Sequence, residues 1–222
     1  MMKPELIVML TNHDRTVSEA QDVFEICKNS KAKYFGFKEE GLSLDQMKKL
    51  FQYMKENGKT TFLEIVAYSE KECLEGIKMA LECRVDYVMG TKYYESVNRI
   101  CQEHHLTYLP FLGEVHGRPS ILEGTAKEMI KEAKYLESKG VKGFDLLGYR
   151  YVGNKKELNE EVIKNVSSKI CLAGSIDSYS RLDEVIQANP WTFTIGSAFF
   201  NHQFGDTMKE QIDAVCMYVR KK

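Results

Sequence analysis

The chain contains 222 residues, of which 31 are basic and 32 are acidic, so its formal net charge is −1. A chain of this length is long enough to bury a large hydrophobic core. A charge near zero, without any long basic segment, argues against a protein dedicated to nucleic acids or to membrane surfaces.

One pattern repeats along the whole chain: a short apolar run rich in β-forming residues, then turn residues, then a segment of helical periodicity. The predicted strands are Glu5–Thr11, Lys33–Phe37, Thr60–Val66, Val85–Met89, Leu106–Leu112, Lys142–Leu147, Lys169–Ala173 and Trp191–Gly196. The predicted helices are Val17–Asn29, Leu44–Glu56, Glu70–Glu82, Tyr93–His104, Ala126–Ser138, Lys155–Asn165, Tyr179–Ala188 and Asp206–Arg220.

The helix starts support this assignment. The capping-box pattern, a hydroxyl residue followed three positions later by Glu or Gln, occurs at Thr16, Ser43, Ser69 and Thr125. Gly58 and Gly140 lie where a left-handed residue commonly ends a helix.

Alternating strands and helices predict parallel strands joined by right-handed crossovers. Eight such units predict closure into an α/β (β/α)8 TIM barrel, a single domain that spans residues 1–222. An open, doubly wound sheet is the alternative fold, and it usually has fewer strands at this length.

In such barrels the functional groups come from the carboxyl ends of the strands and from the loops that follow. Two glycine turns end the last two predicted strands: Gly174-Ser175 and Gly196-Ser197. Glycine lets an anion approach the backbone closely, and amides at a helix N-terminus provide unpaired donors. The pair of turns therefore predicts a phosphate-binding site.

The segments Ala173-Gly174-Ser175-Ile176 and Ile195-Gly196-Ser197-Ala198 resemble the turns of the phosphate-binding (β/α)8 barrels. That superfamily, the ribulose-phosphate-binding type, includes ribulose-phosphate epimerases, histidine-biosynthesis isomerases, phosphoribosylanthranilate isomerase and N-acylmannosamine-6-phosphate epimerase. The resemblance implies that the two turns hold the phosphate of a substrate. Ser175 replaces a second glycine that many members carry, and neither the metal set of the pentose-phosphate epimerases nor the paired aspartates of the histidine isomerases is present.

Charged residues at or near the ends of other strands are the candidate catalytic groups: Lys38, Glu64, Glu114 and Asp145. A charge within an apolar strand is costly unless it is paired or reaches solvent, so these residues predict either a reactive barrel mouth or an internal salt-bridge network. A carboxylate with a raised pKa can remove a proton next to a carbonyl group. Lys38 or Lys92 can stabilise the resulting enediolate, or form a Schiff base if its ammonium is sufficiently desolvated.

Four further residues are candidate substrate-binding groups: Asn12, Lys92, Arg118 and Arg150. The segment 113–124 is the longest connection, and its glycines can act as hinges of a lid that carries Arg118. The loop at 148–154 is a possible second lid, from which Arg150 can meet an anionic group bidentately. Exposed surface arginines are the structural alternative.

The residues predict a protein that binds a small phosphorylated metabolite, in the first instance a sugar phosphate, and isomerises or epimerises it by proton transfer. The alternatives are an aldolase or decarboxylase acting on a similar substrate, and a non-catalytic barrel that senses such a metabolite. No spacing typical of a metal-binding motif is present, so we expect neither a metal nor another cofactor. A metal-dependent lyase or epimerase, with Asn12-His13-Asp14 and Glu64 or Asp145 as ligands, is a third alternative.

The six cysteines are scattered without a CxxC pair, which favours free thiols in a reducing compartment. No N-terminal signal segment and no run near the roughly 18 apolar residues of a membrane span occur. We therefore expect a cytoplasmic protein without nucleic-acid or membrane partners. A homodimer is expected only because two-fold assemblies are common.

Overall fold

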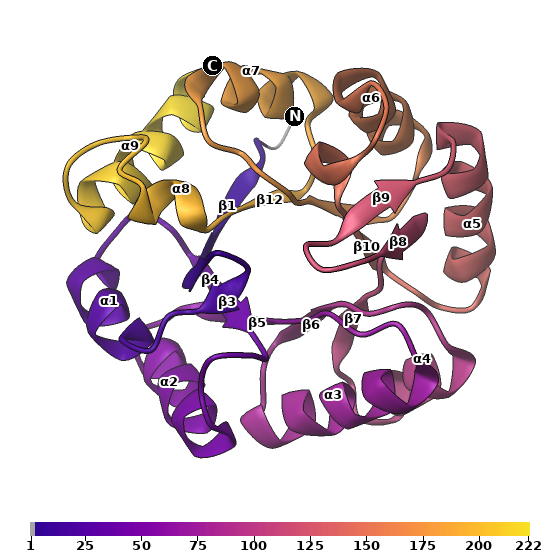
Figure 1. Cartoon of the computed structure of the whole chain (residues 1–222), viewed down its shortest axis with the longest axis horizontal. Helices are drawn as coiled ribbons and strands as arrows, with labels where there is room; N and C mark the ends of the chain where they lie inside the picture. Colours follow the sequence, from indigo (N-terminus) through magenta and orange to yellow (C-terminus); the bar gives the residue numbers. More distant parts are fainter. Residues whose placement is uncertain (1–2) are drawn as a thin grey trace.

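The computed structural model describes residues 3–222, and its centre is a ring of eight parallel strands surrounded by helices (Figure 1). The strands of the ring are β1 (Glu5–Met9), β4 (Tyr34–Lys38), β5 (Thr60–Ile65), β6 (Tyr87–Gly90), β7 (Thr107–Leu109), β10 (Gly143–Leu146), β11 (Lys169–Leu172) and β12 (Thr192–Ile195). Their spatial order is β10-β11-β12-β1-β4-β5-β6-β7.

The ring closes between β7 and β10. The Asp145 amide donates a hydrogen bond of 2.9 Å to the Pro110 carbonyl, and the Leu112 amide donates one of 3.2 Å to the Asp145 carbonyl. A parallel bridge also joins Phe111 to Asp145. The predicted (β/α)8 barrel is therefore confirmed.

The helices outside the ring are α1 (Ala20–Cys27), α2 (Leu44–Glu56), α3 (Glu70–Cys83), α4 (Glu95–Glu103), α5 (Ala126–Ser138), α6 (Lys155–Asn165), α7 (Tyr179–Ala188), α8 (Ser197–Phe200) and α9 (Met208–Lys221). The sequence prediction of α2, α5, α6 and α7 is correct at both ends. No helix in the described chain is long and apolar enough to cross a membrane.

Two antiparallel hairpins and a short 3-10 helix interrupt the βα pattern at the carboxyl end of the barrel, which faces the viewer in Figure 1. One hairpin consists of β2 (Thr11–Asn12) and β3 (Arg15–Thr16), and the other of β8 (Glu114–His116) and β9 (Ile121–Glu123). The 3-10 helix η1 spans Gly148–Arg150. The sequence pattern predicted Thr11 as the end of the first strand, Thr16 as a helix cap, and loops for the other residues of these elements.

The helix ends show where the local sequence pattern predicts the structure correctly and where it does not. The capping boxes at Ser43, Ser69 and Thr125 are confirmed, and Gly58 and Gly140 have positive φ directly after α2 and α5. The box predicted at Thr16 is wrong. The Thr16 hydroxyl instead donates to the Lys38 carbonyl (2.7 Å) and accepts from the Lys38 amide (3.0 Å). It therefore ties the first hairpin to β4, and α1 begins at Ala20 without a side-chain cap.

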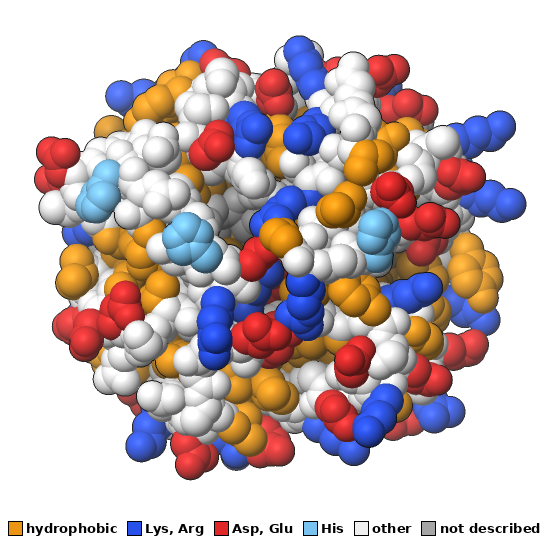
Figure 2. Space-filling model, in the orientation of Figure 1, with side chains coloured by type: hydrophobic (Ala, Val, Ile, Leu, Met, Phe, Trp, Pro, Cys, Tyr) orange, Lys and Arg blue, Asp and Glu red, His pale blue; other side chains and the backbone are white. Residues whose placement is uncertain are grey.

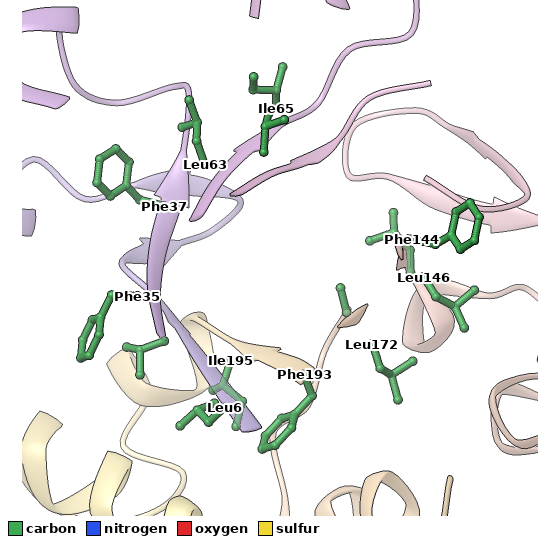
Figure 3. Packing of buried hydrophobic residues seen from close by; sticks show 14 of the residues in the cluster. Leu6, Phe35, Phe37, Leu63, Ile65, Phe144, Leu146, Leu172, Phe193 and Ile195 are labelled. Atoms are coloured by element: carbon green, nitrogen blue, oxygen red, sulfur yellow. The ribbon is translucent and has the colours of Figure 1, made fainter. Parts of the chain in front are cut away.

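Alternation along the strands divides the core into two layers. Outward-facing residues such as Leu6, Phe35 and Phe193 pack against the helices (Figure 3). The inward-facing residues fill the barrel itself: Ile7, Met9, Phe62, Met89, Leu109 and Cys171, with Tyr34, Tyr87 and Trp191 packed against them. All six cysteines of the chain are buried and free.

The same alternation places the charged residues. Gly36 and Phe62 are paired across β4 and β5, and both belong to the inward-facing positions. Two residues further on, Lys38 is paired with Glu64, so both side chains point inward just above the packed interior. A polar pair thus covers the apolar filling at the carboxyl end of the barrel.

Candidate active site

A cavity of about 320 Å³ opens at the carboxyl end of the barrel. Figure 2 shows the same face, with basic and acidic side chains gathered around its hollowed centre. The cavity is lined by both glycine turns and by Asp14, Lys38, Glu64 and Arg150. These groups come from the first, second, third, sixth, seventh and eighth βα units, so only the closed ring brings them together.

The turn after β11 requires glycine at position 174. Gly174 has φ +119°, and a Cβ added there would lie 2.8 Å from the Tyr149 Cβ. The Arg181 guanidinium donates to the Ser175 carbonyl, and the Ile176 amide donates to the Gly174 carbonyl at 2.9 Å. These two hydrogen bonds fix the conformation of the turn, and both Gly174 and Ser175 line the cavity.

The turn after β12 leads into the short helix α8. A Cβ at Gly196 would lie 2.6 Å from the Thr11 Oγ1 and 2.8 Å from the Thr11 carbonyl oxygen, so the loop after β1 fits closely against this glycine. Ser197 and Ala198 begin α8 and line the cavity. The first amides of a helix have no intrahelical acceptor. Both turns predicted from the sequence therefore border one cavity.

A chain of ion pairs runs along the cavity from Glu64 through Lys38 and Asp14 to Arg150. The Lys38 Nζ lies 3.4 Å from Glu64 Oε1 and 3.0 Å from Asp14 Oδ1, and the Arg150 Nη2 lies 3.0 Å from the same Asp14 oxygen. The Lys38 and Glu64 side chains are only 11% and 12% exposed.

These pairs determine the charge of Lys38. Burial disfavours its ammonium, but the carboxylates of Glu64 and Asp14 outweigh burial, so the pKa of Lys38 is raised. Burial likewise disfavours the Asp14 carboxylate, and Lys38 and Arg150 outweigh it and lower the pKa of Asp14. Lys38 is therefore an ammonium ion and Asp14 a carboxylate at neutral pH.

Asp145 lies below this network. Its side chain is fully buried, does not line the cavity and has no hydrogen-bond partner for either carboxyl oxygen within residues 3–222. Burial, reinforced by the Glu64 carboxylate and opposed by Lys38, raises the pKa of Asp145 well above its usual range. Burial therefore favours the protonated form of Asp145, which lies below the cavity and does not line it.

Asp14 lines the cavity, although the sequence did not single it out as a catalytic or substrate-binding candidate. It sits at the tip of the β2–β3 hairpin, where His13 and Asp14 both have positive φ, of 48° and 62°. Two such residues in a two-residue loop form the tight turn that best joins antiparallel strands. The His13 amide donates to the Ser197 Oγ at 3.1 Å, which ties this hairpin to the turn after β12. The turn-forming run Asn12-His13-Asp14 was the available signal.

Besides Asp145, the structure places four predicted site residues outside this cavity: Asn12, Lys92, Glu114 and Arg118. Lys92 and Glu114 line a separate cavity of about 560 Å³ beside α5. Glu114 lies there because segment 113–124 folds into a hairpin in which it is exposed. Asn12 is half-buried in β2 and lines neither cavity, and its Oδ1 has no partner among the described residues.

Arg118 fastens the tip of the β8–β9 hairpin. Its Nη1 donates to Glu40 Oε1 (2.7 Å) and its Nη2 donates to the Val66 carbonyl (2.6 Å). The Tyr68 hydroxyl also donates to the Gly117 carbonyl at 2.9 Å. Ser120, from the same tip, lines the cavity. The hairpin thus covers part of the barrel mouth.

The arrangement defines a (β/α)8 barrel with a charged pocket at the carboxyl ends of its strands. No group of three or more His, Cys, Asp or Glu side chains within residues 3–222 is placed to hold a metal ion. No protein-family model and no curated protein matches the chain.

Solved structures of the same fold resemble it. Orotidine 5′-phosphate decarboxylase from Pyrococcus horikoshii is 16% identical, with a TM-score of 0.70 over 96% of this chain and 99% of that chain. N-(5′-phosphoribosyl)anthranilate isomerase from Pyrococcus furiosus is 8% identical, with a TM-score of 0.68 over 99% and 100%. A glycerol uptake operon antiterminator regulatory protein from Listeria monocytogenes is 16% identical, with a TM-score of 0.59 over 87% and 91%. These likenesses establish the fold alone.

Proposed function

We propose that this protein binds a small phosphorylated metabolite, in the first instance a sugar phosphate, and isomerises or epimerises it by proton transfer. One observation carries the proposal: a single cavity has the two glycine turns on one side and the Lys38–Glu64 pair on the other. A phosphate held by the turns would extend the rest of the metabolite toward this pair.

The proposed phosphate site consists mainly of backbone. Amides at the start of α8 and in the turn after β11 provide donors, and the hydroxyls of Ser175 and Ser197 add two more. Arg150 borders the same cavity, and its guanidinium has donors beyond the one that Asp14 uses. Two of the three similar structures described above are enzymes whose names contain a phosphorylated substrate, which agrees with this assignment.

The charged pair is suited to chemistry next to a carbonyl group. In the proposed step the Glu64 carboxylate takes a proton from the carbon beside the carbonyl, and the electrons of that bond form the carbon–carbon double bond of an enediolate. The negative charge moves to the carbonyl oxygen, next to the Lys38 ammonium. Return of the proton to the former carbonyl carbon, with transfer of the proton of the neighbouring hydroxyl group to the enediolate oxygen, gives an isomer. Delivery of a proton to the first carbon from its opposite face, by water or a second acid, gives an epimer, and Glu64 keeps the proton that it took.

The state of Lys38 favours this chemistry over a Schiff base. A Schiff base requires a neutral amine, whereas Glu64 and Asp14 hold Lys38 as an ammonium ion. An aldolase or decarboxylase that uses the ammonium only as a charge remains an alternative, since one similar structure is a decarboxylase. A metabolite sensor is a second alternative, since another is a regulatory protein.

A screen of phosphorylated metabolites by thermal shift tests binding, because a ligand of the native state raises the melting temperature. Ketose phosphates that bind are then incubated with the protein in D₂O, and loss of the proton beside the carbonyl is followed by NMR. We expect exchange that Glu64→Gln abolishes while binding persists.

Glu114→Gln is the matched control, because Glu114 lies in the other cavity. Binding without exchange would favour the sensor, and cleavage products would favour the lyase. Absence of binding by every phosphorylated compound would contradict the proposal.

A further inference from the structure

A smaller cavity, distinct from the one beside α5, adjoins the first cavity beneath the tip of the β8–β9 hairpin. It measures about 290 Å³ and shares Asp14, Lys38 and Ser120 with the first cavity. The two cavities therefore share part of their walls. The smaller one is lined by residues 118–120 of the β8–β9 tip, and neither glycine turn lines it.

This smaller cavity is lined by three basic side chains from separate elements and by the carboxylates of Asp14 and Glu40. Arg15 comes from β3, Lys38 from β4 and Arg118 from the tip of the β8–β9 hairpin. Lys38 is already engaged, because Glu64 and Asp14 both pair with it. The charge still available at this end is therefore that of the two arginines.

Arg15 and Arg118 have donors to spare. The exposed Arg15 side chain forms no hydrogen bond or ion pair with any other described residue. Arg118 uses one donor on Glu40 and one on the Val66 carbonyl. A guanidinium carries five N–H donors, so three of Arg118 remain. Glu40 is the carboxylate that offsets one of the two charges.

We infer that the substrate carries a second anionic group, a carboxylate or a phosphate, at the end opposite its first phosphate, and that Arg15 and Arg118 bind it. This inference rests on the proposed function, since the glycine turns must hold the first phosphate. The planar guanidinium matches the geometry of both anions, and two arginines from different hairpins can close on one group. Binding of the second group would also fasten the β8–β9 hairpin over the occupied cavity.

The test compares phosphate esters that differ only by the second anionic group. Sorbitol 6-phosphate and 6-phosphogluconate form one pair, and glycerol 3-phosphate and 3-phosphoglycerate form a shorter one. Fructose 6-phosphate and fructose 1,6-bisphosphate test a second phosphate. We expect the doubly anionic member of at least one pair to bind about tenfold more tightly by calorimetry.

Variants assign that gain to the two arginines. Arg15→Gln and Arg118→Gln should each remove most of the gain, measured as the ratio of the two Kd values. Arg15→Gln should also leave the Kd of the singly anionic member unchanged. Arg99→Gln, on the exposed face of α4, is the matched control and should keep the gain. Glu40→Gln breaks the Arg118–Glu40 pair but keeps both positive charges, so it should preserve or increase the gain.

The outcomes separate this inference from the proposed function. If every phosphate ester fails to bind, both are wrong. If single phosphates bind and the second anionic group never increases affinity, only the second site is wrong. If Arg118→Gln and Glu40→Gln weaken both members of a pair equally, Arg118 only fastens the hairpin, and the inference is likewise overturned.

Discussion

Replacement of Lys38 by Met should destabilise the fold through the carboxylate that it leaves behind. The Met side chain keeps the apolar stem of the lysine and removes its charge. Asp14 retains Arg150 as a partner, whereas Glu64, at 12% exposure, loses its counter-charge. Removal of one partner of a buried pair costs roughly 3–5 kcal/mol. Because Glu64 still borders a cavity, we expect a loss at the lower end of this range.

A double-mutant cycle with Glu64→Gln shows whether the loss comes from this pair. A neutral amide needs no counter-charge, so the free energy lost in the double variant should be smaller than the sum of the two single losses. We expect a coupling of at least about 1 kcal/mol, measured by urea denaturation at pH 7. Additive losses, within about 0.5 kcal/mol, would refute the view that Lys38 and Glu64 act as one buried pair.

Three further predictions concern other parts of the barrel. Because the pKa of Asp145 is raised in the folded state, the stability of the protein should fall as the pH rises above the unfolded pKa of about 4. Asp145→Asn should lack this fall, so urea midpoints should favour the variant at neutral pH and converge with those of the native protein near pH 4. Thr207→Ala removes the capping box of α9 and should cost about 1 kcal/mol in thermal unfolding, and an unchanged melting temperature would contradict the cap. Gly174→Ala should strain the turn and abolish phosphate-ester binding, seen by calorimetry, while circular dichroism still reports a folded barrel.

The barrel could be predicted because its signals are local and repeated. Each strand of the ring is an apolar run, and helices such as α2 and α5 carry a capping box at one end and a positive-φ glycine at the other. The two glycine turns were found by the same logic, since they directly follow strands whose position the apolar pattern shows. Lys38 and Glu64 could be singled out from the sequence because each places a charge at or near the end of an apolar strand.

The remainder of the site depends on folding within loops. The strands β2 and β3 are two residues long, which is too short for any periodic pattern, so Asp14 could not be distinguished from its neighbours. Glu114 follows strand β7 in sequence, but the β8–β9 hairpin carries it away from the pocket. Asp145 was a candidate catalytic residue, and the apolar run around it could not show that its side chain would be fully buried beneath the cavity rather than in the cavity wall.

The contact between His13 and Ser197 joins the first and the last βα units, because β1 and β12 are neighbours in the ring. A ligand held between these units would link β1 and β12, the first and the last strands of the ring in sequence. Exchange of the backbone amide hydrogens in β1 and β12 should then slow when the ligand is present. The degree of protection would measure how much the ligand stabilises the pairing of these two strands. Ligand binding and the stability of the folded barrel would thus be thermodynamically linked.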